Sequence, residues 1–485
     1  MNKHQHLLDT FLEICRIPHG TGNESALREM LIEKAAGLGL PHKVDEAGNL
    51  SITIPAAPGM EAAPGILLQA HLDMVCVAEP GLAHDFTTQG LDVIEEEGWL
   101  TARGTSLGAD NGVGCAMAMG IAAEKELRHG PLQLLFTVEE ETGMQGMIRM
   151  PADFIDPAMR YAVNIDFEAE EYICIGCAGG LVVNAHGEVP CAQYDFEQKE
   201  KYSLWRVKAG GVQGGHSGLE IDGRPLNLHH TMFTLLEELH GQLLSYAGGD
   251  AVNSIPAHAE MVIATPRSQD EKVQAAFAAF AETFSEQYTY PGGVPSLTLE
   301  SLIRRPFEGL SMETTYKLAA LIRKLPDGVL SRHEALGGSP QSSSNLGVVH
   351  LNDQGFLHLG LAVRSDSPSE SQTLKKQVLT SLKEIPELDV SADEFPIWQP
   401  QPENALVQHC QAGRQGLFDE AATLISVHAG IECALLVSKK PDLQAVSIGP
   451  IIQFVHSPRE RANIQSMQRV YDWLLEIIRT IDSMA

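Results

Sequence analysis

Apolar residues in the first third of the chain follow two spacings in turn. Residues 7–17 repeat at the helical interval up to Pro18, and residues 24–40 repeat it again, with Asn23 placed to cap the second helix and Gly39 placed to end it. A third helical pattern and four extended, mostly apolar runs follow, at residues 111–127 and at residues 49–56, 65–75, 132–139 and 160–166. Apolar strands separated by helices predict an α/β fold, with a mixed sheet flanked by helices.

The middle third has a different pattern, in which strands with partial alternation mix with amphipathic helices. The strand-like runs are residues 201–211, 257–266 and 354–365, and the helical runs are residues 226–246 and 271–288. The first pattern returns near the end of the chain, with a strand at 443–450 and a helix at 464–481. We therefore expect an α/β domain made of residues 1–188 and 391–485, with an α+β domain of residues 189–390 inserted in it.

Composition and charge narrow the class of protein. The chain has 485 residues, 44% of them hydrophobic, and this length favours two domains over one core. The net charge of −29 argues against nucleic acid and against membranes as partners, because phosphate binding needs a basic surface.

The first residues and the cysteines of the chain favour a cytoplasmic protein. The first residues lack the apolar core of a signal peptide, and no run approaches the roughly 18 apolar residues of a membrane span. Eight cysteines are scattered without a disulfide framework, which fits a reducing compartment. Cys174 and Cys177 form one C-x-x-C, for which we expect a buried structural role because zinc usually requires further ligands.

Candidate chemistry lies at the ends of the predicted strands. His71 and Asp73 stand two residues apart in "LLQAHLDMV", so both would point to one side of a strand, with Asp73 orienting a metal-bound His71. Asp110 lies in the glycine-rich turn "RGTSLGADNGVG", which lacks the lysine of a phosphate-binding loop, so a cation is the favoured partner. Taken alone, each residue also fits a purely structural role: His71 and Asp73 fit a polar strand end, and Asp110 fits a helix cap.

Further acids follow the next strands. The stretch "LLFTVEEETGMQG" ends in three neighbouring glutamates, 139 to 141, whose mutual repulsion requires positive charge nearby. Asp166 ends the strand of "YAVNIDFEAEE", and His456 lies in a loop after the strand of "SIGPIIQFVHSPRE"; alone, these two fit a turn acid and a surface histidine. Together, such ligands suit two divalent metals that share a carboxylate, with one more carboxylate to take a proton from water.

Eight blocks of the chain resemble, in order, the dinuclear zinc exopeptidases of the aminoacylase and carboxypeptidase type, and within them the bacterial aminoacyl-histidine (Xaa-His) dipeptidases. The blocks are "LLQAHLDMV", "ARGTSLGADNGVG", "EEETGMQG", "NIDFEAEEYICIGCAGG", "GGHSG", "NSIP", "HAGIEC" and "SIGPIIQFVHSP". The resemblance implies that His71 and Asp166 hold one zinc ion and that Glu141 and His456 hold the other, with Asp110 bridging the two. Cobalt or manganese replaces zinc in some relatives.

The same resemblance assigns the remaining chemistry of the α/β domain, which it makes the catalytic domain. Asp73 would orient His71, and Glu140 would be the general base that deprotonates water and then protonates the leaving amine. The family often has a cis peptide bond after its bridging aspartate, here Asp110–Asn111.

The resemblance makes the inserted domain a lid that mediates dimerisation. His216 would stabilise the tetrahedral intermediate, often across the dimer, and Asn253 and Arg364 would grip the backbone or carboxylate of the substrate. Core packing or a surface ion pair is the alternative for Arg364. His428 and Glu432 would line the substrate pocket.

One register question concerns which two of the three neighbouring glutamates act. In the family, the active pair directly precedes a small residue and a glycine, here Thr142 and Gly143. This selects Glu140 and Glu141. Glu139 is then a bystander, whose charge solvent or a neighbouring base would offset.

We expect a cytoplasmic, homodimeric metallo-dipeptidase that cleaves Xaa-His dipeptides of the β-alanyl-histidine type. One alternative is an N-acyl amino acid deacylase, which would use the same metals and base. A non-catalytic relative that binds proteins through the lid is another, although such relatives usually lose a ligand and none is missing here.

Overall fold

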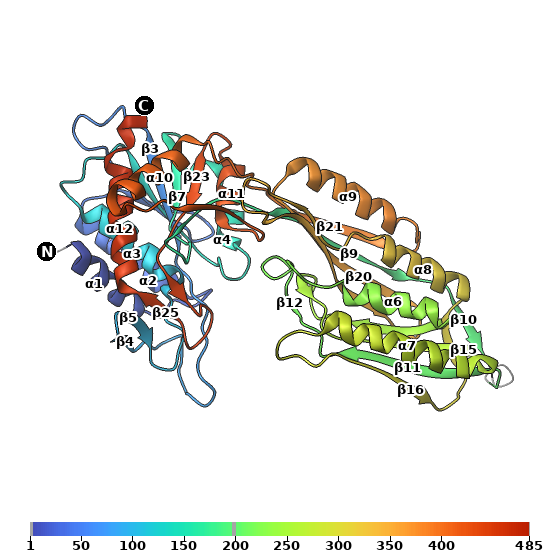
Figure 1. Cartoon of the computed structure of the whole chain (residues 1–485). Helices are drawn as coiled ribbons and strands as arrows, with labels where there is room; N and C mark the ends of the chain where they lie inside the picture. The colour runs from blue at the N-terminus through green and yellow to red at the C-terminus, as the bar shows by residue number, and fades with distance from the viewer. Residues whose placement is uncertain (1–2, 196–199, 485) are drawn as a thin grey trace. The chain divides into compact units, whose positions relative to one another are not determined.

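The computed structural model describes residues 3–195 and 200–484, which form two compact units (Figure 1). Unit 1 comprises Met1–Cys177, Pro400–Ser426 and Ile431–Ala485, and unit 2 comprises Ala178–Gln399 and Val427–Gly430. None of the described helices is long and apolar enough to cross a membrane.

Unit 1 is built on an eight-stranded mixed sheet in the order β1-β2-β6-β3-β7-β23-β8-β22. Its strands are β1 His42–Val44, β2 Leu50–Ile54, β3 Gly65–His71, β6 Leu132–Thr137, β7 Met159–Asn164, β8 Tyr172–Cys177, β22 Thr423–Val427 and β23 Gln444–Ser447. The four central strands β6, β3, β7 and β23 run parallel. Every residue of β3 and β6 is buried, as expected for parallel strands with helices on both faces.

Helices cover both faces of this sheet (Figure 1). They are α1 Lys3–Cys15, α2 Ser25–Gly37, α3 Ala109–Ala123, α4 Gln145–Arg149, α10 Ala405–Phe418, α11 Glu432–Lys439 and α12 Ile464–Arg479. α1 and α12 pack on α3, where Gly112 lies against Phe11 and Gly120 against Tyr471, and a β-carbon at Gly120 would come within 2.8 Å of that phenol. A four-stranded sheet completes the unit, with β4 Val93–Glu96, β5 Trp99–Ala102, β24 Ile452–Gln453 and β25 Arg461–Asn463.

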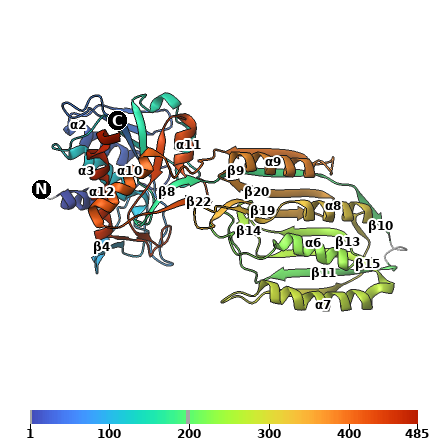
Figure 2. The ribbon, with the colours of Figure 1, turned by 45° about the horizontal axis from the view of Figure 1, so that its top comes forward.

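Unit 2 holds a nine-stranded sheet whose main path is β16-β11-β15-β13-β19-β20-β9-β21 (Figure 2). The bounds are β9 Gly179–Glu188, β11 Tyr202–Gly210, β13 Gln242–Gly248, β15 Ala259–Pro266, β16 Ser296–Leu302, β18 Gly328–Arg332, β19 Pro340–Leu351, β20 Phe356–Ser365 and β21 Asp389–Phe395. Two short pairs lie beside it, β10 Cys191–Tyr194 with β17 Phe307–Leu310, and β12 Gly215–His216 with β14 Ser254–Ile255.

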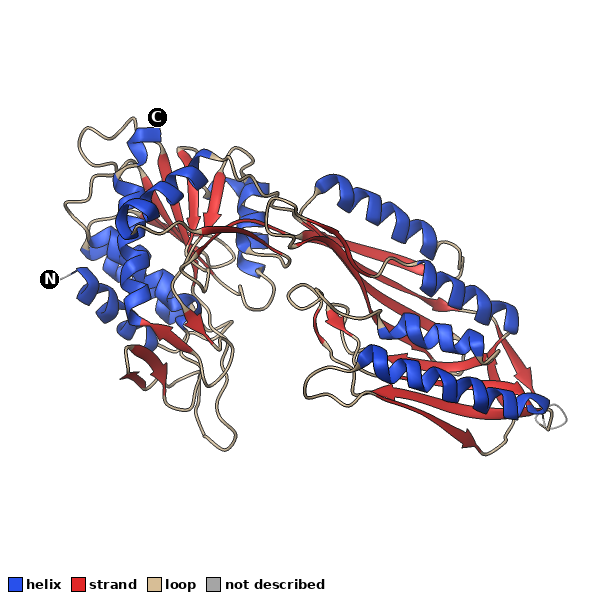
Figure 3. Cartoon of the chain, in the orientation of Figure 1, coloured by secondary structure: helices blue, strands red, loops and turns tan. Residues whose placement is uncertain are grey.

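This sheet consists of two halves with the same βαββαβ order. One half runs β11, α6, β13, β15, α7, β16 and the other runs β9, α8, β19, β20, α9, β21, and each pairs its strands in the same sequence. The halves join where β13 pairs antiparallel with β19. Figure 3 shows the four helices on one face of the sheet: α6 Leu228–Glu238, α7 Asp270–Tyr288, α8 Met312–Lys324 and α9 Pro368–Leu382.

The sequence predictions of the α/β fold and of most elements are confirmed, and some details of the helices are wrong. Asn23 does not cap α2: Glu24 holds the N-cap position, and the Asn23 amide donates to the carbonyl of Thr87. The helix predicted at 226–246 ends at Glu238, and β13 begins at Gln242, because His240 and the glycine after it break the helix. Whether unit 2 acts as a lid stays a prediction.

Candidate metal centre

The five side chains predicted as metal ligands meet at the carboxyl end of the parallel strands of unit 1. His71 is the last residue of β3, Asp166 follows β7, Glu141 follows β6, and Asp110 stands in the first turn of α3. Ligands in open α/β sheets bind at this edge. The Asp110–Asn111 peptide bond is cis, as the resemblance implies.

The two oxygens of Asp110 face two different histidines. Oδ1 lies 3.0 Å from His71 Nε2, and Oδ2 lies 3.2 Å from His456 Nε2. Asp166 Oδ1 is 3.4 Å from His71 Nε2, and Glu141 Oε2 is 3.0 Å from His456 Nε2. The cluster is therefore two groups of one histidine and one carboxylate, which share Asp110.

The ring of His71 is fixed through its other nitrogen. Nδ1 donates to the backbone carbonyl of Asp73 at 3.0 Å, which leaves Nε2 free to act as a ligand. Because β3 ends at His71, the predicted strand geometry for this pair is wrong, although Asp73 Oδ1 still lies 3.5 Å from Nδ1. The closer partners of the Asp73 carboxylate are the N–H groups of Glu140 and Glu141 and the hydroxyl of Thr21, at 2.9 to 3.1 Å.

The three neighbouring glutamates lie in a turn rather than on a strand. β6 ends at Thr137, and Glu139 has a positive φ of 53°, so strand alternation does not set the direction of these side chains. Other segments hold the turn through its backbone: Asn49 Oδ1 accepts from Val138 N–H, and Glu24 Oε1 accepts from Glu139 N–H, both at 3.1 Å. Each of four successive N–H groups thus donates to a side chain from another part of unit 1.

The carboxylates of this turn differ in their surroundings. Glu139 Oε2 makes a 2.7 Å ion pair with Arg149, so its partner is a neighbouring base, one of the two alternatives expected for it. Glu141 contacts His456. Burial raises the pKa of Glu140 to about 9.

The cluster has more buried acid than its two histidines can balance. Burial raises the pKa of Glu168 to about 8 and that of Asp166 to about 6. Hydrogen bonds to Asp110 and Glu141 raise the pKa of His456 to about 10. Burial opposes charge on His71, but Asp166 and Asp110 hold its pKa well above the usual value. Carboxylates that resist ionisation and histidines that retain protons indicate that the site lacks positive charge, which a bound cation would supply.

The donor atoms fit divalent cations. His71, Asp110 and Glu141 each offer a ligand atom, and these atoms lie within 4.8 Å of one another. Imidazole nitrogen and carboxylate oxygen are ligands of catalytic zinc, and a shared carboxylate suits a pair of metals.

A second cluster, in unit 2, contains four of the residues predicted to contact substrate. The pairing of β12 with β14 places His216 opposite Ser254, and Ser217 N–H donates to the Asn253 carbonyl at 2.8 Å. His428 Nε2 lies 2.7 Å from the Ser343 hydroxyl. Burial and the charge of Arg364 lower the pKa of His428 to about 4, and burial and Arg364 also lower the pKa of His216.

Arg364 has no carboxylate partner among the residues that the structure describes. Its guanidinium is partly buried, burial lowers its pKa, and Nε has no hydrogen-bond partner. The neighbouring Arg332 differs, because it forms an ion pair with Asp222. An arginine buried without a counterion indicates an anion site.

Glu432 belongs to unit 1, beneath the metal-ligand cluster. It is 1% exposed, and its Oε2 accepts hydrogen bonds from Gln69 Nε2 and, at 3.0 Å, from the Thr137 hydroxyl. Its predicted contact with substrate stays a prediction. Cys174 and Cys177 are buried, as expected for a structural pair.

Sequence reasoning did not identify the acids Glu24, Glu168 and Glu460 as part of the centre. Glu24 stands at the start of a helical pattern, and Glu460 lies between two arginines, which is typical of exposed surface. Of the three, only Glu168 could have been found from the sequence, because it stands two residues after the predicted ligand Asp166.

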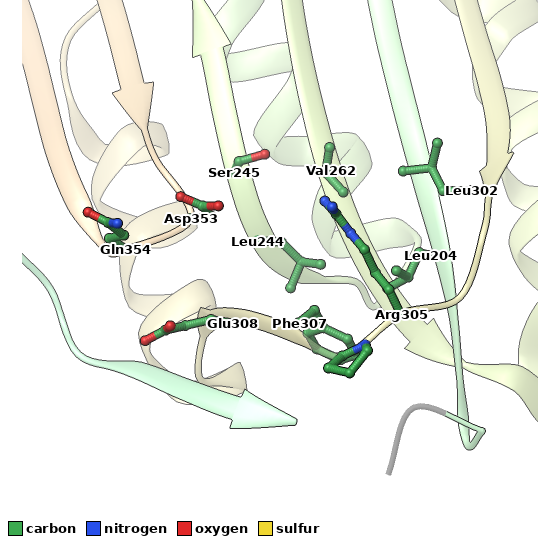
Figure 4. A pocket seen from close by; sticks show the side chains of 11 residues that line it. Leu204, Leu244, Ser245, Val262, Leu302, Arg305, Phe307, Glu308, Asp353 and Gln354 are labelled. Atoms are coloured by element: carbon green, nitrogen blue, oxygen red, sulfur yellow. The ribbon is translucent and has the colours of Figure 1, made fainter. Parts of the chain in front are cut away.

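A hollow in unit 2 is separate from these residues. It has a volume of about 400 Å³ and lies on the open face of the sheet, lined mainly by Leu204, Leu244, Val262, Leu302 and Phe307 (Figure 4). None of the predicted site residues lines it.

The chain is similar to known peptidases over most of its length. Residues 67–480 match the model of peptidase family M20/M25/M40. The chain is 31% identical to the cytosol non-specific dipeptidase of Escherichia coli, over 98% of both chains. It superimposes on the aminoacylhistidine dipeptidase of Vibrio alginolyticus with a TM-score of 0.88 and 27% identity, covering 98% of this chain and 96% of that one. A tripeptidase from Staphylococcus aureus shares the fold, with a TM-score of 0.62 and 19% identity over 99% of both chains.

Proposed function

The chain belongs to peptidase family M20/M25/M40 and is a dipeptidase, and we propose that it hydrolyses Xaa-His dipeptides with two bound zinc ions. The observation that carries the metal assignment is Asp110, whose two oxygens face His71 and His456. His71 and Asp166 would hold one ion, His456 and Glu141 the other, and Asp110 would bridge them. Such a pair supplies a polarised carbonyl and an activated water.

The protein's own groups then move the protons. Glu140 lies close to the proposed ligands, but it is not among the carboxylates that contact His71 or His456. It is therefore the proposed general base. It takes a proton from the attacking water and returns it to the leaving amine. The charge of two cations would lower the raised pKa of Glu140 and keep it ionised.

Unit 2 supplies the groups proposed to recognise substrate. Arg364, whose guanidinium has no carboxylate partner among the described residues, binds the terminal carboxylate of the dipeptide. His216 donates to the oxyanion that develops on the carbonyl, and Asn253 and His428 contact the substrate beside it. An enzyme that requires a terminal carboxylate cleaves only at a chain end.

Three further properties belong to this proposal. The preference for a C-terminal histidine rests on similarity to the Vibrio aminoacylhistidine dipeptidase. A cytoplasmic location rests on similarity to the cytosolic E. coli enzyme and on the scattered cysteines. We also propose a homodimer formed through unit 2.

A substrate panel with and without metal tests the proposal. The zinc-loaded protein should hydrolyse β-alanyl-histidine and other Xaa-His dipeptides faster than N-acetyl amino acids, and removing metal with a chelator should abolish turnover until zinc is returned. Turnover of N-acetyl amino acids alone would instead establish a deacylase. A chain that binds two metals and turns over neither class would be a binding protein.

A further inference from the structure

One buried carboxylate holds the segment that carries Asp110. Glu460 is 2% exposed, and its two oxygens accept hydrogen bonds from four consecutive backbone N–H groups. Oε2 accepts from Leu107 at 2.8 Å and Gly108 at 3.1 Å, and Oε1 accepts from Ala109 at 2.8 Å and Asp110 at 3.3 Å. The carboxylate therefore fixes the backbone of Asp110 and of the three residues before it.

The charge of Glu460 is directed to this backbone. In the described parts of the chain it forms no ion pair, although arginines stand on both sides of it: Arg459 lies over the ring of Phe454, and Arg461 lies over the ring of Trp99. The N-terminus of α3 and its free N–H groups provide the compensating positive potential. A mere helix cap would accept from one or two of these groups.

Glu460 also belongs to the loop that carries His456. The two residues are four apart, and the backbone carbonyl of Glu460 accepts a 3.0 Å hydrogen bond from Thr101 of β5. One short segment thus presents the His456 ring and grips the backbone of Asp110, and Asp110 Oδ2 lies 3.2 Å from His456 Nε2. The carboxylate fixes the distance between two of the proposed metal ligands.

We propose that Glu460 is a positioning residue for the metal pair, which holds Asp110 so that each carboxylate oxygen faces one of the two metal ions. The inference rests on the proposed function. It assigns Glu460 no contact with metal or substrate, and it predicts that loss of this carboxylate weakens metal binding even when the protein is fully folded.

The test is titration of the metal-free protein with Zn²⁺ or Co²⁺ alone, comparing the wild type with Glu460→Gln. The amide of glutamine keeps one acceptor oxygen but presents an NH₂ group to the other pair of backbone donors, so half of the hydrogen bonds to residues 107–110 are lost. We expect metal dissociation constants to rise roughly 10- to 100-fold, as for other partners that orient metal ligands. The visible absorption bands of bound Co²⁺ should also change, because the geometry of Asp110 changes.

Asn404→Ala provides the matched control. Asn404 caps α10 by accepting from the N–H of Leu406 at 2.8 Å, within unit 1 but away from the ligands. Its loss should lower the free energy of unfolding by about 1 kcal/mol and leave metal affinity and the Co²⁺ spectrum unchanged.

The outcomes separate this inference from the proposed function. If the wild type binds two metals and Glu460→Gln binds them equally well, with only a lower melting temperature, Glu460 is structural and the inference is wrong. If the wild type binds no divalent metal, both proposals fall. Should Glu460→Gln not fold, Glu460→Asp keeps the charge but is one methylene too short to reach all four donors. That variant should show a smaller loss of affinity, and unchanged affinity there would overturn the inference.

Discussion

Unit 1 gathers acids around two histidines, whereas unit 2 places an unpaired arginine among histidines that resist protonation. In unit 1, burial raises the pKa of Glu140 to about 9, and hydrogen bonds raise that of His456 to about 10. In unit 2, burial lowers the pKa of His428 to about 4, and Arg364 has no counterion among the described residues. One cluster has surplus negative charge and the other surplus positive charge.

Uncompensated charge in a buried setting is costly, so it persists where a ligand supplies the missing charge. We therefore expect the first cluster to bind cations and the second to bind an anion. Under the proposed function, the two metal ions would supply the positive charge that the first cluster lacks, and the terminal carboxylate of the dipeptide would supply the negative charge that Arg364 lacks. Under the proposed function, this contrast would separate the chemistry of the reaction, in unit 1, from recognition of the substrate, in unit 2.

The largest expected effect comes from Glu140. Glu140→Gln should lower kcat by roughly 10²- to 10⁴-fold, the usual contribution of a general base, and leave the zinc content near that of the wild type. Activity assays with elemental analysis of the same samples measure both quantities. A loss of zinc from this variant would make Glu140 a ligand rather than a base.

A substitution of Arg364 tests whether unit 2 recognises the substrate. Arg364→Ala should lower kcat/KM by roughly 10- to 100-fold, chiefly through KM, because a charge-assisted hydrogen bond contributes about 1.5–3 kcal/mol. Metal content should not change. The control is Arg206→Ala, on β11 of the same unit, which removes an arginine paired with Glu260 and Glu300. If both variants behave alike, Arg364 does not bind substrate.

The two units of the metal-free protein should respond to pH in opposite directions. Because the native pKa values of Glu140 and His456 are raised, the native state binds more protons than the unfolded chain from about pH 4.5 to 10, and stability falls as pH rises through that range. The pKa values of His230 and His428 are lowered to about 4, so unit 2 loses stability as pH falls from about 6.5 to 4.

Hydrogen exchange of the metal-free protein at pH 5, 7 and 9, corrected for intrinsic rates, measures this contrast. Peptides of unit 1 should lose protection at pH 9, and zinc should restore it by replacing protons. Peptides of unit 2 should lose protection at pH 5, with or without zinc. Equal protection of unit 1 at pH 7 and 9 would mean that its acids do not form a cation site.

The smallest expected effect comes from Glu139. Glu139→Gln breaks an exposed ion pair with Arg149, which contributes about 0–1 kcal/mol, and should change neither kcat nor zinc content. Glu141→Gln, two residues away, should lower zinc content. A Glu139 variant as inactive as the Glu140 variant would shift the active pair by one residue.

Periodicity and residue type predicted the sheet of unit 1 and the ligand cluster, because both leave marks in the sequence. The strand of residues 65–71 is uniformly apolar until it ends in a histidine, and Asp110 stands in a glycine-rich turn. The partners of Glu24, Asn49 and Glu460 are backbone N–H groups, which every residue except proline carries, so the sequence contains no sign of these contacts. The helix predicted at 226–246 is too long because the short apolar segment after Gly241 fits a helix or a strand equally well.

The edge-to-edge join of the two halves of unit 2 has a consequence for solubility. Pairing β13 with β19 covers two strand edges that would otherwise be open to aggregation, and leaves β16 and β21 at the ends of the sheet. β21 carries exposed Asp389, Asp393 and Glu394, so two copies of this strand would bring like charges together. The two halves thus form one wide sheet, and the acids of β21 disfavour pairing of further copies of the chain with one of its outer edges.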